Sequence, residues 1–132
     1  MLAGADLVAF VPTTDLARAR TFYEGALGLR VIEADPSALA IDANGTMLRV
    51  TPVPELRPAG YTVCGWRVDD IGAAVRDLGG RGVGFARYDG MAQDELGVWT
   101  APGGAKVAWF ADPDGNVLSL TEFPPSGSSA TA

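Results

Sequence analysis

The chain has 132 residues, enough for one domain or two tightly packed halves, of which 48% are hydrophobic and 20% charged. Its formal net charge of −6 and sequence pI of about 4.4 argue against a nucleic-acid footprint and make an anionic membrane surface a poor partner. The start of the chain lacks both a basic region and a long apolar run. We therefore expect no signal peptide and no membrane span, and predict a cytoplasmic location.

Histidine and cysteine counts exclude further chemistry. The chain has no histidine, which removes Ser-His-Asp and Cys-His catalysis and every His-based zinc or iron site. Cys64 is the single cysteine and lies in an apolar stretch. We therefore predict no internal disulfide, and an inert core thiol in place of a nucleophile.

The first half of the chain predicts the order β-α-β-β-β. A strand is expected over residues 6–12, followed by a helix with its N-cap among Thr13, Thr14 and Asp15 that runs to about Leu27. Gly28 ends the helix. Three short strands follow, over residues 29–34, 38–42 and 46–51. The last two are joined by Asn44-Gly45, a strong two-residue hairpin turn.

The second half repeats this order after a linker rich in proline. A strand is expected over residues 61–68, and Asp69 or Asp70 caps a helix whose apolar residues recur at helical spacing from Ile71 to Leu78. Strands are expected over residues 83–88, 105–111 and 117–123. The chain is therefore an internal repeat of one supersecondary unit.

The two halves differ in length between helix and hairpin. Asp15 matches Asp70 at an offset of 55, whereas Gly45 matches Gly115 at an offset of 70, so the second half carries 15 additional residues. They are assigned to residues 89–103, a segment that contains Trp99 and is either a surface elaboration or a flap over a site. Residues 124–132 predict a disordered tail.

The final predicted hairpin turns at Asp112-Pro113-Asp114-Gly115-Asn116, where both acids are interpreted as turn formers. Its second strand ends in Glu122, which is spaced by two and by four residues from Leu120 and Leu118 and therefore lies on the same side of the strand. The carboxylate therefore points toward whatever those leucines face.

The repeat, the helix segment from Asp15 to Leu29 and the turn from Asp112 to Asn116 together resemble the vicinal oxygen chelate superfamily. This is the group of glyoxalase I, the extradiol dioxygenases and the fosfomycin and bleomycin resistance proteins, and the resemblance covers about residues 6–123. It implies an α+β fold of two tandem βαβββ modules, residues 1–58 and 59–123. The modules form a cup-shaped mixed sheet with the helices outside.

The resemblance also implies where metal ligands would lie in an enzyme of this group. The four positions fall on Val8, Arg49, Val63 and Glu122. Valine cannot coordinate a metal and the Arg guanidinium only donates, so we predict no metal and no cofactor. We hypothesise that Arg49 replaces the cation, either paired with Glu122 or holding an anionic ligand group. The alternative is an outward-pointing, solvated Arg49.

We expect a metal-free protein that binds or sequesters a small organic molecule in the cup. The resemblance to the family also implies a homodimer. Trp99 is expected to act as an aromatic wall of the site. The alternative is a metal-independent lyase or isomerase with Glu122 as base and Arg49 as anion stabiliser. A metal-dependent glyoxalase-like lyase is the third reading. The predicted ligand-binding residues are Val8, Phe10, Arg49, Val63, Trp66, Trp99, Trp109, Leu120 and Glu122.

Overall fold

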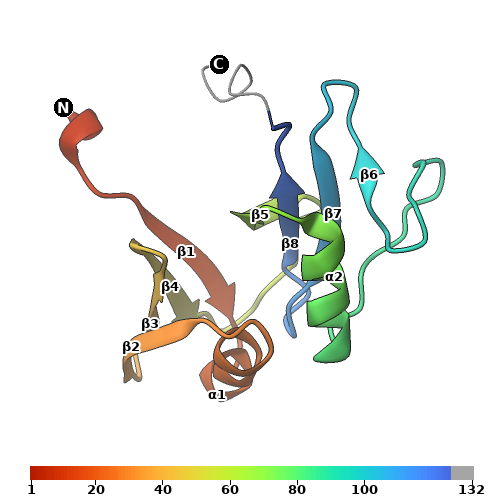
Figure 1. The fold of residues 1–132 in the computed structure, drawn as a ribbon. Coiled ribbons are helices and arrows are strands. Elements are labelled where there is room, and N and C mark those ends of the chain that lie inside the picture. The colour runs from red at the N-terminus through yellow and green to blue at the C-terminus, as the bar shows by residue number, and fades with distance from the viewer. Residues whose placement is uncertain (126–132) are drawn as a thin grey trace. The chain divides into compact units, whose positions relative to one another are not determined.

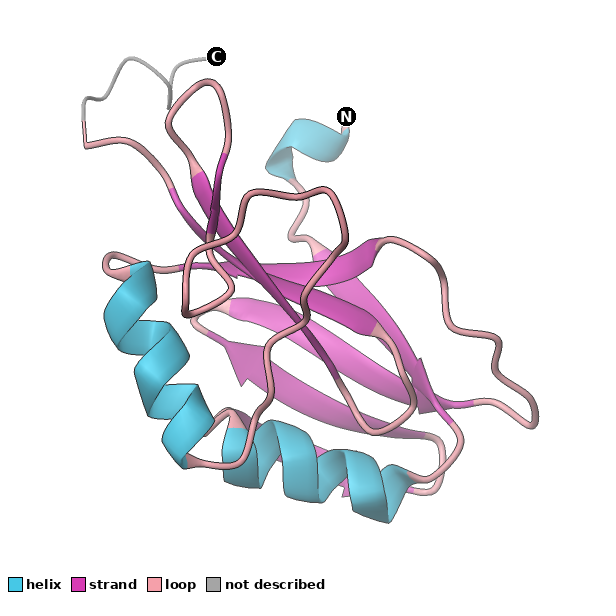
Figure 2. Cartoon of the chain, turned by 90° about the vertical axis from the view of Figure 1, so that its right-hand side faces the viewer, coloured by secondary structure: helices cyan, strands magenta, loops and turns pink. Residues whose placement is uncertain are grey.

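The computed structural model describes residues 1–125, arranged as two compact units (Figure 1). The first module comprises Met1–Ala59 together with Asp112–Asn116, and the second comprises Gly60–Ala111 together with the described residues from Val117 onward. Each module contains a four-stranded sheet and a main helix, so the fold is α+β, as predicted (Figure 2). Most of the predicted disordered tail, residues 126–132, lies outside the described part of the chain.

The first module begins with η1 (Leu2–Gly4) and β1 (Val8–Thr13). Asp15 is the N-cap of α1 (Leu16–Arg20), because its Oδ1 accepts the Arg18 backbone N–H at 3.0 Å. The helix continues as a π-helical stretch, η2 (Thr21–Ala26), and Gly28 follows with φ 69°. The remaining strands are β2 (Arg30–Asp35), β3 (Ala38–Ala43) and β4 (Thr46–Pro52).

The sheet of the first module has the order β1-β4-β3-β2, with β1 parallel to β4 and the other pairs antiparallel. α1 packs against β3 and β4. Because side chains alternate along a strand, one side of the sheet faces this helix and the other faces away from it. The helix side carries the buried apolar residues of the strands, Val11, Leu39, Ile41, Leu48 and Val50.

The predicted hairpin turn between β3 and β4 is confirmed. Asn44 and Gly45 both have positive φ, 52° and 95°, as the primed hairpin turns require. Asp42 stabilises the turn by accepting the Gly45 backbone N–H at 2.8 Å.

The second module repeats the arrangement with β5 (Thr62–Arg67), α2 (Ile71–Gly80), β6 (Trp99–Thr100), β7 (Lys106–Ala111) and β8 (Val117–Glu122). Its sheet order, β5-β8-β7-β6, matches that of the first module position by position. Asp70 caps α2 by accepting the Ala73 N–H at 3.0 Å. α2 packs against β7 and β8, which bury Phe110, Leu118 and Leu120 (Figure 1).

The strand predicted over residues 83–88 does not form. Phe85 makes only an isolated bridge to Phe110, and Ala86 N–H donates to the Trp109 carbonyl at 2.8 Å. The outer edge of β7 is instead shared, because β6 pairs with the start of β7 and residues 85–86 meet its end. Gly82, with φ 91°, lies just before this segment, and Gly84 lies within it, where a glycine weakens a strand. The fourth strand therefore comes from the segment predicted as an insertion.

The turn Asp112–Asn116 packs within the first module. Asp112 Oδ2 accepts the Tyr23 hydroxyl at 2.6 Å and the Asn116 amide at 2.8 Å, and the same amide donates to the Pro12 carbonyl at 2.9 Å. Asp112 Oδ1 also accepts the backbone N–H groups of Asp114 and Asn116, which confirms its role as a turn former. Asp112 and Asn116 are both buried, so this turn is part of the core of the first module.

Asp114 extends the same network to the start of α1. Its carboxylate accepts hydrogen bonds from the hydroxyl of Thr13 and the hydroxyl of Thr14. It also accepts the Thr14 backbone N–H at 3.0 Å and Arg18 Nη2 at 3.1 Å. Burial by itself raises the pKa of the Asp114 carboxyl. The hydrogen bonds and the Arg18 charge outweigh burial, and hold the pKa below its usual value.

This pKa predicts a pH-dependent stability. A carboxyl whose pKa is lower in the folded than in the unfolded chain stabilises the fold above pH about 4, and loses that effect as the pH falls through the folded-state pKa. Asp114→Asn should lower the free energy of unfolding at pH 7 by about 1–3 kcal/mol and flatten its decline at acid pH. Urea denaturation from pH 2 to 7 measures both. Asp77→Asn, on the exposed side of α2, is the control. Equal acid slopes for Asp114→Asn and the wild type would contradict the assignment.

Candidate functional site

In the first module, three predicted site residues share the side of the sheet that faces away from the helix. Phe10 on β1 is the register partner of Arg49 on β4, and Val8 is the partner of Met47. Phe10 is 60% exposed and Arg49 is half-buried. The pairing thus places Val8, Phe10 and Arg49 together, on the side away from α1.

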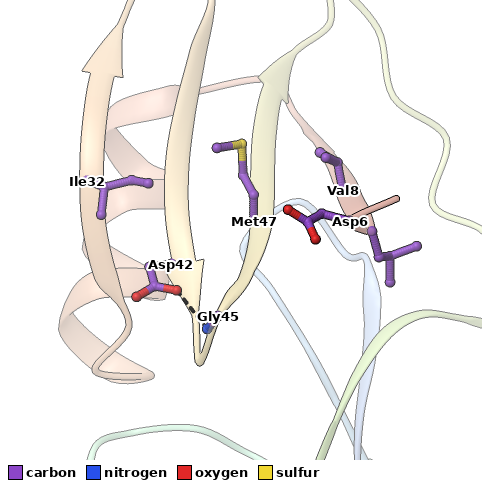
Figure 3. Close-up of a pocket in the computed structure, with 7 residues that line it drawn as sticks. Asp6, Val8, Ile32, Asp42, Gly45 and Met47 are labelled. Atoms are coloured by element: carbon purple, nitrogen blue, oxygen red, sulfur yellow. Dashed lines mark hydrogen bonds between the residues drawn. The ribbon is translucent and has the colours of Figure 1, made fainter. Parts of the chain in front are cut away.

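The same side of the sheet is hollowed into a pocket of about 340 Å³ (Figure 3). Met47 and Asp42 are register partners on its floor, and Ile32 comes from the neighbouring strand. Asp42 is already held by the Gly45 N–H and lies 3.8 Å from Arg30. The residues that line this pocket are Asp6, Leu7, Val8, Ile32, Asp42, Gly45 and Met47.

In the second module, an aromatic cluster lies on the side of the sheet away from α2. Trp99 and Trp109 have ring centroids 6.1 Å apart at 36°, and Tyr88 meets Trp109 edge-on at 5.6 Å and 82°. Trp109 reaches this side because its strand neighbours, Ala108 and Phe110, are buried on the other. Trp99 lies on the same side because it pairs with Val107, two residues before Trp109. Tyr88 is 41% exposed and the tryptophans are half-buried, so a ligand can reach the cluster.

Next to the cluster, the sheet has a flat floor. Ser119 pairs with Trp109 on one side and with Gly65 on the other. A Cβ atom on Gly65 would lie 2.6 Å from Ser119 Oγ, so a larger residue at position 65 requires the serine hydroxyl to move. A glycine inside a strand permits close approach to the backbone. We call this side of the sheet, with Gly65, Tyr88, Trp99, Trp109 and Ser119, the aromatic face.

Two other predicted ligand-binding residues of this module, Trp66 and Leu120, lie on the α2 side of the sheet. Leu120 is 4% exposed and belongs to the core beneath α2, and the half-buried Trp66 stacks on Phe110 with centroids 6.5 Å apart. Val63 falls at a register shift in the pairing of β5 with β8.

Glu122 lies on the α2 side of its sheet, with Leu118 and Leu120. Its Oε1 accepts the backbone N–H of Ile71, the first residue of α2, at 2.9 Å. Lys106, its cross-strand partner, places Nζ 3.9 Å from Oε2. A carboxylate at a helix N-terminus satisfies a free N–H and complements the helix dipole. This geometry gives Glu122 a structural role.

The repeat explains why Arg49 and Glu122 are not equivalent. In the first module Arg49 pairs with Phe10, and in the second Ser119 pairs with Gly65. The offset of 55 relates Phe10 to Gly65, and the offset of 70 relates Arg49 to Ser119. The counterpart of Arg49 is therefore Ser119, three residues before Glu122. An odd shift along a strand reverses the side of the sheet. The predicted pairing of Arg49 with Glu122 thus loses its geometric basis.

The family's metal chemistry does not fit the residues at these positions. Val8 and Val63 carry no ligand atom, the Arg49 guanidinium only donates, and Glu122 is engaged with α2. Within residues 1–125, no three Cys, Asp or Glu side chains gather as a metal site would require. Burial raises the pKa of the Cys64 thiol, which favours the protonated form over a thiolate ligand or nucleophile.

Comparison with known proteins identifies the family. The model of the Glyoxalase/Bleomycin resistance protein/Dioxygenase superfamily matches residues 5–120, and the chain belongs to that superfamily. Curated proteins yield no match.

Among described residues, no helix is long and apolar enough to cross a membrane.

Solved structures share the fold at low sequence identity. The antibiotic binding protein TnmS3 from Streptomyces sp. CB03234 is 24% identical, with a TM-score of 0.68 over 94% of this chain and 99% of that one. A glyoxalase / bleomycin resistance protein from Catenulispora acidiphila is also 24% identical, with a TM-score of 0.67 over 90% and 98%. A lactoylglutathione lyase from Agrobacterium tumefaciens is 18% identical, with a TM-score of 0.66 over 90% and 93%.

Sequence reasoning missed the floor of the aromatic face. The offset of 70 between the two hairpins pointed to Ser119 as the counterpart of Arg49, and alternation along β5 would then have brought in Gly65. Tyr88 gave no such signal, because its segment was expected to form a strand.

The capping contact of Glu122 predicts a specific mutational pattern. Glu122→Ala removes the acceptor of the Ile71 N–H and should lower the free energy of unfolding by about 0.5–2 kcal/mol, whereas Glu122→Gln keeps an acceptor oxygen and should cost less. Urea denaturation measures the stability, and amide hydrogen exchange at the start of α2 locates the loss. Equal protection of those amides in the wild type and Glu122→Ala would refute the capping role.

The contact between Gly65 and Ser119 predicts coupling between the two positions. Gly65→Ala forces Ser119 to move and should destabilise by about 1–3 kcal/mol, as overpacking does. In a Ser119→Ala background the same change should cost at least about 1 kcal/mol less. A double-mutant cycle by denaturation gives this coupling energy. Additive effects would show that the side chain of Ser119 does not restrict position 65.

Proposed function

We propose that this protein binds a small, planar, partly apolar organic molecule on the aromatic face without converting it. The observation that carries the proposal is the cluster of Tyr88, Trp99 and Trp109 on the side of the sheet that α2 leaves uncovered. A flat ring can lie on the tryptophans, where stacking adds to the area buried. Gly65 leaves room for it to approach the sheet backbone.

The polar groups of the aromatic face support binding more than catalysis. Thr121 places its hydroxyl group on this side of β8, where it can orient a ligand by hydrogen bonds, whereas Ser119 on the same side is buried, with 7% exposed. Among the described strand residues on this side, none has an imidazole, carboxylate or amine that could act as general base. Glu122, the base of the lyase or isomerase alternative, is engaged in capping α2.

The comparisons are consistent with this function. TnmS3 is described as an antibiotic binding protein, and the superfamily includes bleomycin resistance proteins. We propose a sequestering role of that kind and binding that needs no metal, so dialysis against EDTA should leave the affinity unchanged. Homodimer formation and a cytoplasmic location stay predictions.

Replacing Trp99 tests the function. Trp99→Ala should weaken binding of neutral fused-ring aromatic amides, with 2-naphthamide as reference, by about tenfold, because it removes one of the two stacking surfaces. Ligand-observed NMR titration measures the affinity without relying on tryptophan fluorescence. Tyr61→Ala is the matched control, since Tyr61 is an aromatic residue that is 71% exposed and directly precedes β5.

Two results would overturn the proposal. Equal affinities in Trp99→Ala and the wild type would overturn the assignment of the binding site to the aromatic face. Failure of 2-naphthamide and the other fused-ring amides to bind would do the same. Loss of the bound probe to a new product, followed by mass spectrometry after long incubation, would show that the protein is an enzyme.

A further inference from the structure

We infer that the aromatic face selects planar molecules that carry an anionic group, and that Arg67 is the residue that recognises this charge. The inference rests on the proposed function and names the ligand class of the same site. Arg67 is exposed on β5, outside the set of residues that the sequence pointed to.

The strand register places Arg67 in line with the aromatic cluster. Arg67 pairs with Thr121 on β8, Thr121 with Val107 on β7, and Val107 with Trp99 on β6. These four residues form one row across the sheet, on the same side as Trp109. Neighbouring strands are about 4.8 Å apart, so Arg67 and the Trp99 backbone lie roughly 14 Å from each other. The long Arg side chain can shorten this gap to the length of a fused-ring carboxylate.

The surroundings of Arg67 leave its charge available. It forms no ion pair with any residue that the structure describes. Its guanidinium carbon lies 5.4 Å from the ring centroid of Phe123, a cation–π contact that orients the side chain and leaves its N–H donors uncommitted. Phe123 directly follows β8, two residues after Thr121, which is the strand partner of Arg67.

The charge distribution makes Arg67 selective. Among the described strand residues of the aromatic face, it is the only charged side chain. The nearest cation of β7, Lys106, lies on the α2 side beside Glu122. A protein of net charge −6 attracts anions poorly, so a lone guanidinium on an apolar face provides local attraction for one.

The guanidinium also matches the geometry of a carboxylate. Its planar fork donates two parallel hydrogen bonds to the two oxygens, which lysine cannot do. The Thr121 hydroxyl lies between Arg67 and the cluster and can donate a further bond. The ligand class is therefore a flat aromatic body with a carboxylate, or a similar planar anion, at one end.

The experiment compares two probes of the same shape, 2-naphthoate and its neutral amide, 2-naphthamide, by ligand-observed NMR titration. Wild-type protein should bind the carboxylate about tenfold more tightly than the amide, and more sodium chloride should reduce that preference. Arg67→Gln should remove the preference without changing the affinity for the amide, and Arg67→Lys should keep only part of it. Arg76→Gln, an exposed arginine on α2, is the matched control.

The outcomes separate this inference from the proposed function. Equal binding of both probes, weakened by Trp99→Ala, would overturn the role of Arg67 and leave the aromatic face as the site. A carboxylate preference that persists in Arg67→Gln would also overturn it. Failure of both probes to bind would overturn the proposed function together with the inference. A preference lost in Arg67→Gln and kept in Arg76→Gln would establish the role of Arg67.

Discussion

The docking of the turn Asp112–Asn116 in the first module is the interaction on which much of the structure depends. The two carboxylates of the turn accept hydrogen bonds from Tyr23 and from Thr13 and Thr14, just before α1. The amide of Asn116 donates to the Pro12 carbonyl. These groups are largely buried, so each bond satisfies a polar atom that would otherwise be costly to remove from water. The turn between β7 and β8 is thereby fixed at the same place where β1 ends and α1 starts.

Strand alternation then divides each module into two sides with different uses. The side under the helix takes the large apolar residues and, in the second module, also the carboxylate of Glu122. The other side keeps residues that a core would not select, such as Gly65, the two neighbouring tryptophans and Arg67. A binding surface can therefore change its residues without disturbing the packing beneath the helix, which fits a superfamily that includes both enzymes and resistance proteins.

Local patterns allowed much of the fold to be predicted. The caps at Asp15 and Asp70, the Asn44-Gly45 turn and most strands depend on neighbouring residues, and they form as expected. The segment 83–88 failed because an edge strand needs a free partner, and β7 offers its outer edge to two segments. Contacts between residues distant in sequence decide which segment pairs with each part of β7, and no local pattern predicts this.

The sequence by itself determined the duplicated module, the caps that begin its helices and the family. The tertiary structure decided which side of the sheet each candidate residue occupies. Glu122 shows the reason: its identity and parity with the leucines were readable, but only the packing of α2 against β7 and β8 reveals what those leucines face. One residue of register moves a side chain from the side that faces away from the helix to the core side, and register is set by pairing between strands far apart along the chain.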